Sequence, residues 1–140
     1  MFDAFNIFDF NRNGLISVHE IAQGLASIGV HATIDEAELF ISRYDKSGDR
    51  RLNATEFGNA FLAFDPYYSS MVSRRPSNYV MRPIRPDDCF LPNTAYEFQA
   101  MWRTHIRVEN AGEALRQRLN TLPGFNAYEA FNSLDLNDDG

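Results

Sequence analysis

The chain has 140 residues, of which 44% are hydrophobic, with twelve Phe and six Tyr among them, and this composition excludes wholesale disorder. A net charge of −6 argues against a nucleic-acid binder that works by overall charge, and the single cysteine excludes an internal disulfide framework and a cysteine-based zinc site. The acidic N-terminal start lacks the basic region of a signal peptide, and no apolar run approaches the ~18 residues of a membrane span. We therefore expect a cytoplasmic protein without a membrane span.

The first segment with a chemical signature is 9–20, DFNRNGLISVHE, which carries oxygen-bearing side chains at alternate positions. Ca²⁺ is bound by roughly six to eight oxygen atoms from carboxylates, amides, hydroxyls, carbonyls and water. Gly14 permits the positive φ that a sharp turn in such a loop requires. The candidate ligands are the side chains of Asp9, Asn11, Asn13, Ser17 and Glu20 and the backbone carbonyl of Leu15. At every position the segment resembles the calcium-binding loop of the EF-hand proteins, the calmodulin and troponin-C superfamily.

Apolar residues at helical spacing flank this loop on both sides. They are Phe2, Phe5 and Phe8 before it and Ile21, Leu25 and Ile28 after it. Gly29 suits the end of the second helix, and Thr33 with Glu36 has the pattern of a capping box that opens a third. The apolar residues of that third helix are Leu39, Ile41 and Tyr44. The pattern predicts a helix–loop–helix followed by a further helix.

A second loop, 45–56, reads DKSGDRRLNATE and begins 36 residues after the first (45 − 9 = 36). Its departure from the family pattern is Arg50, where a glycine is expected; a left-handed conformation there costs roughly 1–2 kcal/mol. The strain at Arg50 weakens calcium binding at loop two, whereas its three acidic ligands, against two in loop one, strengthen it. The sequence therefore does not rank the calcium affinities of the two loops. Its candidate ligands are Asp45, Ser47, Asp49, the carbonyl of Arg51, Asn53 and Glu56. The resemblance implies that Ile16 and Leu52 pair in a short β-bridge, and that residues 1–64 form one paired EF-hand domain.

The middle of the chain lies outside this resemblance. Residues 65–93 contain five of the six prolines, which predicts an extended connector. Its tyrosines and arginines would either clamp a partner or form a strap across the chain's own domain, and the sequence does not decide between the two.

Residues 94–120 are predicted to form one long helix, opened by a capping box of Thr94 and Glu97. An apolar stripe follows along 94–119, with arginines beside it, and such a basic amphipathic helix resembles the ligands that EF-hand grooves bind. Because soluble proteins rarely expose a stripe of this size, we expect it to pack against an EF-hand surface, in this chain or in a partner. His105 on this face is interpreted as a packed histidine. The residues predicted to make the contact are Phe98, Met101, Trp102 and Ile106.

The last residues repeat the start of the first hand. Asp135, Asn137 and Asp139, followed by Gly140, occupy positions 1, 3, 5 and 6 of a third loop. Before them stand Tyr128, Phe131 and Leu134, in the phase of the three phenylalanines that precede loop one. We interpret 125–140 as the first half of a third EF-hand in a truncated chain. Without its closing acid, this site is expected to be empty or weakly occupied.

The sequence lacks a glycine-rich phosphate loop, a G-x-S-x-G elbow and a zinc-protease motif, so we do not expect an enzyme. The favoured interpretation is an all-α calcium-binding protein that acts through calcium-dependent protein–protein interaction, as a sensor or regulator. The alternatives are a calcium-stabilised structural subunit of a cytoskeletal or ciliary assembly, and the regulatory module of a larger enzyme. A simple buffer is disfavoured because so much of the chain lies outside the hands. Residues 2–64 contain no methionine, which favours a narrow choice of partner.

Overall fold

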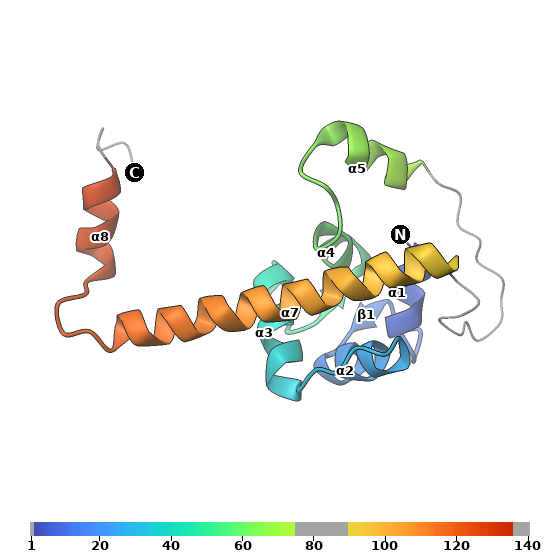
Figure 1. Cartoon of the computed structure of the whole chain (residues 1–140), viewed down its shortest axis with the longest axis horizontal. Helices are drawn as coiled ribbons and strands as arrows, with labels where there is room; N and C mark the ends of the chain where they lie inside the picture. Colours follow the sequence, from blue (N-terminus) through green and yellow to red (C-terminus); the bar gives the residue numbers. More distant parts are fainter. Residues whose placement is uncertain (1, 75–89, 136–140) are drawn as a thin grey trace. The chain divides into compact units, whose positions relative to one another are not determined.

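The structure is a computed structural model that describes residues 2–74 and 90–135 (Figure 1). Its helices are α1 (Phe2–Phe8), α2 (Val18–Ser27), α3 (Ile34–Tyr44), α4 (Ala54–Asn59), α5 (Pro66–Ser73), α7 (Pro92–Asn120) and α8 (Ala127–Leu134), and its strands are β1 (Leu15–Ile16) and β2 (Leu52–Asn53). Apart from these two short strands the described residues fold as helices and loops, which confirms the predicted all-α class. None of the described helices combines the length and apolar character that crossing a membrane requires.

The chain divides into two compact units, Met1–Glu109 and Asn110–Gly140, which we call the N-terminal and the C-terminal unit. The boundary falls inside α7. The N-terminal unit contains α1 to α5 and the first part of α7, and the C-terminal unit contains the rest of α7 and α8.

Capping boxes fix the starts of three helices in the N-terminal unit. At α3 the Thr33 hydroxyl accepts a hydrogen bond from the Glu36 N–H, and the Glu36 carboxylate accepts one from the Thr33 N–H, which confirms the predicted box. The other two boxes open α2 and α4 and are built from loop positions 9 and 12, so each loop is tied to the helix that follows it. They are formed by Ser17 with Glu20 and by Asn53 with Glu56.

The two loops are joined by the β-bridge that the resemblance implies. Strands β1 and β2 run antiparallel, and Ile16 is paired with Leu52. Both side chains are fully buried, so the sheet forms one wall of the core as well as a link between the loops.

The core lies in the N-terminal unit, between the helices of the two hands and the first part of α7. Its members are apolar residues from α1 to α4, from the segments that follow α2 and α4, and from the strands, with one residue from α7. They are Phe5, Ile7, Phe8, Ile16, Ile21, Leu25, Ile28, Val30, Ala37, Phe40, Ile41, Leu52, Phe57, Ala60 and Trp102. Figure 1 shows α7 running across α1, α3 and α4, and the burial of Trp102 among residues of these helices agrees with that view.

Two predictions about the middle of the chain were wrong in detail. Residues 66–73 form helix α5, not an extended connector, because the Asp65 side chain caps the Tyr67 N–H and Pro66 stands at the first helical position, where its missing N–H costs nothing. The rest of the predicted connector, from 75 to 89, lies outside the described residues. Helix α7 begins at Pro92, and the Ala95 N–H already bonds to the Leu91 carbonyl, so Thr94 lies inside the helix and is not its N-cap.

Candidate functional site

In loop one, the side chains at the first three candidate ligand positions turn toward the loop backbone. The Asp9 carboxylate, which is only 6% exposed, accepts hydrogen bonds from the Asn13 N–H (3.1 Å) and the Gly14 N–H (2.9 Å). The Asn11 side-chain oxygen accepts from the Asn13 N–H at 3.0 Å, and the Asn13 side-chain oxygen from the Leu15 N–H at 2.8 Å. These hydrogen bonds hold the loop backbone in a tight turn around the side-chain oxygen atoms.

The acid at position 12 closes the same loop from the opposite side. Oε2 of the Glu20 carboxylate accepts from the Ser17 N–H (2.9 Å) and the Ser17 hydroxyl (2.7 Å). Its Oε1 accepts from the Asn11 N–H at 3.4 Å. Since Asn11 stands near the beginning of the loop and Glu20 at its end, this carboxylate spans the space that a cation would fill.

Loop two is built in the same way. The Asp45 carboxylate accepts from the Gly48 N–H (2.7 Å) and the Ser47 hydroxyl (3.1 Å) through Oδ1 and from the Arg50 N–H (2.8 Å) through Oδ2. The Asp49 carboxylate accepts from the Arg51 N–H at 2.9 Å. The carboxylate of position 12 is again buried, and it bridges both ends of the loop. Its bonds are from the N–H groups of Lys46 (3.0 Å) and Ser47 (2.9 Å) to Oε1 of Glu56, and from that of Asn53 (3.0 Å) to Oε2.

These bonds favour the charged form of the loop-two acids. Partial desolvation acts to raise the pKa of Asp45, but hydrogen bonds from Arg50, Gly48 and Ser47 outweigh it, so the pKa lies below the ordinary value. Desolvation likewise acts to raise the pKa of Glu56, and its backbone N–H donors lower it overall. Both side chains are therefore carboxylates at neutral pH, the form that binds a cation.

Positions 4 and 6 of both loops are left-handed, and each loop places a glycine at one and an arginine at the other. Loop one has Arg12 (φ 56°) before Gly14 (φ 79°), and loop two has Gly48 (φ 77°) before Arg50 (φ 60°). The strain predicted at Arg50 is therefore present, and the sequence interpretation missed the matching strain at Arg12. The signal was Gly48, which marks position 4 as a second place where the loop turns left-handed.

The donor set of each loop fits a hard cation. Within residues 2–74 and 90–135, no three Asp, Glu, His or Cys side chains gather closely enough to hold a metal by themselves. Each site must therefore be completed by amide, hydroxyl and carbonyl oxygens, which the loops supply at Asn11, Asn13, Ser17, Ser47 and Asn53 and at the carbonyls of Leu15 and Arg51. An all-oxygen set of this kind suits Ca²⁺, whereas zinc and copper favour nitrogen and sulfur.

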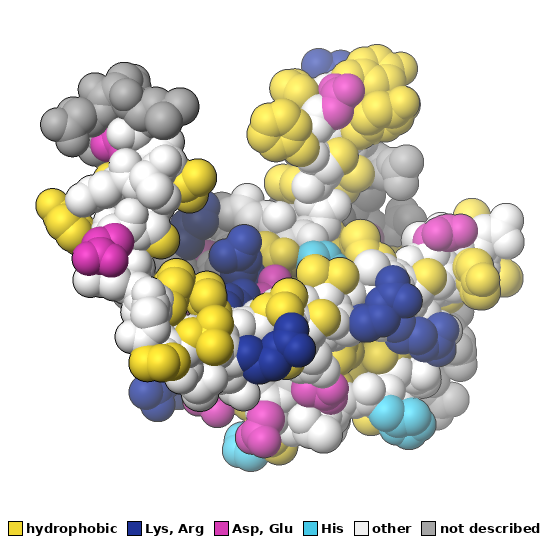
Figure 2. All heavy atoms as spheres, turned by 60° about the vertical axis from the view of Figure 1, so that its left-hand side comes forward, with side chains coloured by type: hydrophobic (Ala, Val, Ile, Leu, Met, Phe, Trp, Pro, Cys, Tyr) yellow, Lys and Arg dark blue, Asp and Glu magenta, His cyan; other side chains and the backbone are white. Residues whose placement is uncertain are grey.

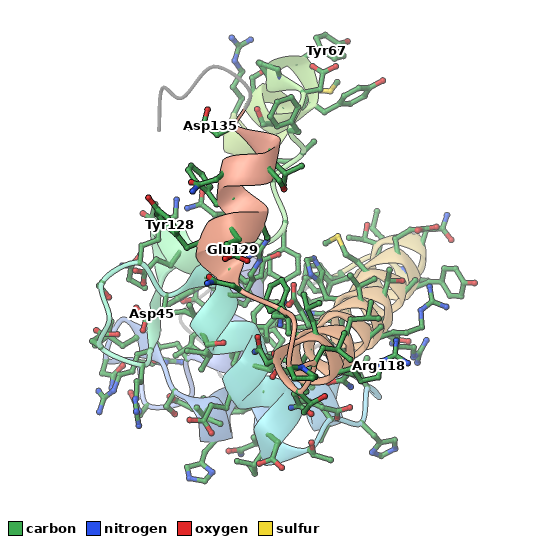
Figure 3. The ribbon with its side chains drawn as sticks, turned by 90° about the vertical axis from the view of Figure 1, so that its left-hand side faces the viewer. Asp45, Tyr67, Arg118, Tyr128, Glu129 and Asp135 are labelled. Carbon is green, nitrogen blue, oxygen red and sulfur yellow. The ribbon has the colours of Figure 1, made fainter. Side chains whose placement is uncertain are left out.

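Only the first residue of the predicted third loop lies in the described part of the chain. Asp135 follows α8, as Asp45 follows α3 (Figure 3), and its N–H bonds to the Phe131 carbonyl at 2.9 Å. The equivalent bonds of Asp9 to Phe5 and of Asp45 to Ile41 measure 3.0 and 2.8 Å. Asn137 and Asp139 lie outside the described residues. The apolar side chains of α8 are exposed, by 73% at Tyr128, 50% at Phe131 and 81% at Leu134.

Trp102 of α7 fills an aromatic pocket on the EF-hand helices. The indole is fully buried, and its ring centroid lies 5.3 Å from that of Phe8, 4.5 Å from Phe40 and 5.2 Å from Phe61. The ring of Phe57 is 6.2 Å away. The indole Nε1–H has no hydrogen-bond partner within the described residues, so the pocket holds Trp102 by packing alone.

The other predicted contact residues of α7 differ in what they touch. Phe98 packs edge-on against Phe8 and at a tilt against Phe61, with centroid distances of 6.4 and 5.4 Å, and Ile106 packs against the core cluster. Met101 is half-buried and does not join that cluster. The stripe therefore faces the hands through three of its four predicted members.

Polar side chains of α7 bind the ends of three EF-hand helices, and the sequence interpretation did not foresee these contacts. An Arg103 Nη2–H donates to the Gly29 carbonyl after α2 at 3.2 Å, and the His105 ring lies 3.1 Å from the Ala60 carbonyl and 3.4 Å from the Tyr44 hydroxyl. An ion pair joins Arg43 of α3 to Glu109 at 3.7 Å. His105 is thus a packed histidine, as interpreted from the sequence.

The described start of the predicted connector is exposed, not packed. Figure 2 shows apolar side chains gathered on α5, and no neighbouring helix covers them in that view. Tyr67, Tyr68 and Met71 are 65%, 58% and 46% exposed, and Phe64, just before α5, is fully exposed. These four side chains therefore do not pack as a strap across the N-terminal unit.

The comparisons with known proteins agree with the fold. Residues 1–62 match the family model of the EF-hand domain pair. The chain is 42% identical over 55 residues to polcalcin Cup a 4 of Hesperocyparis arizonica, covering 39% of this chain and 33% of that protein. It is 39% identical over 67 residues to the probable calcium-binding protein CML11 of Oryza sativa subsp. japonica (46% and 32%) and 40% identical over 63 residues to CML17 of Arabidopsis thaliana (44% and 38%).

The fold, the two loops and these matches define residues 1–62 as an EF-hand domain pair that binds Ca²⁺. This pair is similar to the calmodulin-like calcium-binding proteins. The chain spans about a third of the length of the curated relatives it matches.

Proposed function

We propose that the chain is a calcium-responsive protein that acts through protein–protein interaction, with loops 9–20 and 45–56 each holding one ion. The bound ion supplies a positive charge that draws the loop oxygens together. Asp9 and Asp45 hold the first half of each loop in its turn, and Glu20 and Glu56 reach across from the following helix. Because these carboxylates already bridge both ends of the loop, an ion bound there links the two helices of a hand.

The observation that carries the interaction part of the proposal is the pocket around Trp102. Phe8, Phe40 and Phe57 come from α1, α3 and α4, so the pocket belongs to both hands, and the side chain that fills it comes from an amphipathic helix. The surface therefore suits an aromatic anchor on a helix. It is lined by aromatic rings and not by methionines, so its shape adapts little and its choice of ligand is narrow.

Calcium binding and helix docking favour the same arrangement of the hands. In sensor EF-hands, the ion opens the angle between paired helices and exposes apolar surface. An indole fits between α1, α3 and α4 only where these helices stand apart. We therefore propose that calcium strengthens the hold of the N-terminal unit on α7, or on a partner helix that takes its place.

The third half-loop is proposed to begin a further site with Asp135, Asn137 and Asp139 as its first ligands. The helix-end geometry at Asp135 supports its place in that loop, because the same backbone bond precedes both complete loops.

The test is a calorimetric calcium titration of the whole chain and of Glu20→Gln and Glu56→Gln. Glutamine at these positions still accepts the capping-box bond, so the helices stay intact while the second ligand oxygen is lost. We expect two ions per chain, and one in each variant. Glu38→Gln, an exposed acid on α3 outside both loops, is the matched control and should retain two. A stoichiometry unchanged in Glu20→Gln would refute loop one as a calcium site.

A structural role is the second candidate, and it is favoured by the same helix. A pocket that is already filled by α7 leaves little apolar surface for a sensor to expose when it binds calcium. A separate apolar cluster is exposed and could contact a neighbour in a cytoskeletal or ciliary assembly; it consists of Phe64, Tyr67, Tyr68 and Met71. Circular dichroism and Trp102 fluorescence with and without calcium separate the two. A large response supports the sensor, and tight binding with little change supports the structural subunit.

A further inference from the structure

We propose that His105 couples calcium binding at loop two to the docking of α7, because one imidazole ring binds the ends of both helices of the second hand. The inference rests on the proposed function, in that loop two is taken to hold an ion. It assigns the coupling to a single positioning residue that is itself no calcium ligand.

The hydrogen-bond pattern around the ring is determined by its partners. The Ala60 carbonyl can only accept, so His105 Nε2 carries the hydrogen of the 3.1 Å bond. In the neutral ring Nδ1 is then an acceptor, and it receives the Tyr44 hydroxyl at 3.4 Å. The Tyr44 hydroxyl can donate as well as accept, so both ring nitrogens are paired.

The two partners stand at the C-terminal ends of the two helices of the second hand. Tyr44 is the last residue of α3 and directly precedes Asp45, the first residue of loop two. Ala60 is the C-cap of α4, whose first turn contains Glu56, the last residue of that loop. A change in the spacing of α3 and α4 when loop two binds an ion must therefore lengthen or shorten the bonds of His105.

The ring is held too firmly to follow such a change by itself. It packs edge-on against Phe40 at 5.8 Å and against Phe61 at 6.0 Å, and the next turn of its own helix toward the N-terminus holds the buried Trp102. Movement of α3 against α4 is therefore transmitted to α7 as a whole.

The first hand has no equivalent bridge among the described residues. There, α7 makes its polar contact through Arg103 to the Gly29 carbonyl, which lies beyond the end of α2 and does not involve α1. The coupling should accordingly act on site two and spare site one. Because linkage is reciprocal, docking of α7 tightens calcium at site two by the same factor by which calcium tightens docking.

The experiment measures calcium affinity at one site at a time in the full chain. Glu20→Gln leaves only site two and Glu56→Gln leaves only site one, and His105→Leu, which keeps the apolar bulk but loses both hydrogen bonds, is placed in each. We expect His105→Leu to weaken site two by about tenfold, the loss of roughly 1.4 kcal/mol from two bonds, and to change site one by less than about twofold. Thr104→Ala, on the exposed side of the same turn, should change neither.

Two further variants separate coupling from mere packing. Tyr44→Phe removes one oxygen and should weaken site two by about threefold. His105→Gln restores a donor for Ala60 and should recover part of the affinity. If His105→Leu does not fold, the calcium affinity of site two in Tyr44→Phe tests the coupling by itself. Equal weakening at both sites, or no weakening at site two, would overturn the coupling. If site two fails to bind calcium even with His105 in place, the proposed function of loop two is wrong instead.

Discussion

Replacing Trp102 with alanine removes the only side chain of α7 that belongs to the fully buried core of the described residues. Truncation of a buried Trp or Phe to Ala costs about 3–5 kcal/mol, because the loss of apolar transfer adds to the cavity left behind. The unpaired indole N–H works against the native side chain, since a buried donor without a partner costs about 1–3 kcal/mol. We therefore expect the lower end of the range, about 3 kcal/mol.

The assay is urea unfolding followed by far-UV circular dichroism, because the variant has no tryptophan left to report. A loss of about 3 kcal/mol also lowers the melting temperature by about 12 °C for a domain of this size. Trp102→Phe keeps an aromatic ring and removes the unpaired N–H, so it should cost less than about 1.5 kcal/mol. Met101→Ala, its half-buried neighbour outside the core cluster, should cost less than about 1 kcal/mol. A Trp102→Ala protein within about 1 kcal/mol of the native chain would refute the packing of α7 on the hands.

Arg50→Gly should strengthen calcium binding at loop two about three- to tenfold, because it removes a left-handed non-glycine residue and a nearby positive charge; calorimetry showing equal or weaker binding would contradict this. Gly24→Ala should destabilise the N-terminal unit by about 1–3 kcal/mol, because the added methyl group overlaps the ring of a buried phenylalanine. The control Gly112→Ala meets only the end of a flexible arginine side chain and should stabilise α7 by about 0.5–1 kcal/mol; thermal melts that rank the two alike would argue against the close contact of Gly24 with that ring. In calcium-free buffer, stability should fall as the pH drops below about 4, because Asp45 and Glu56 have lowered pKa values in the folded state. Their contribution is fully present above the unfolded pKa and is lost as the pH falls through the folded one. A urea midpoint that is the same at pH 7 and pH 3 would exclude this contribution.

The local parts of the fold could be predicted because their determinants lie close together in the sequence. The capping box at Thr33, the turn at Gly29 and the pairing of Ile16 with Leu52 each follow from a pattern of a few residues or from the repeat of one loop by the other. The candidate ligands follow in the same way, since alternate oxygen atoms in a twelve-residue frame leave few other structures open.

Helix α5 and the polar contacts of α7 were not predicted from the sequence, for two different reasons. Helix α5 was missed because the prolines of its neighbourhood were given more weight than the Asp65–Pro66 pair, which is itself a helix-start signal. The polar contacts of α7 join residues 61 and 74 positions apart, Tyr44 with His105 and Gly29 with Arg103. No local pattern specifies which distant carbonyl or hydroxyl a side chain will meet, so these partners could be found only in the folded chain.

The short sheet between the loops has a consequence for how the protein responds to rising calcium. Ile16 and Leu52 sit at the middle of their loops, and each strand of the pair is ordered by the other. An ion that orders one loop thereby removes conformational freedom from its neighbour before the second ion arrives, so the second binding event has less entropy to overcome. The two sites then fill over a narrower concentration range than two independent sites would, and the titration curve of the chain should be sigmoidal.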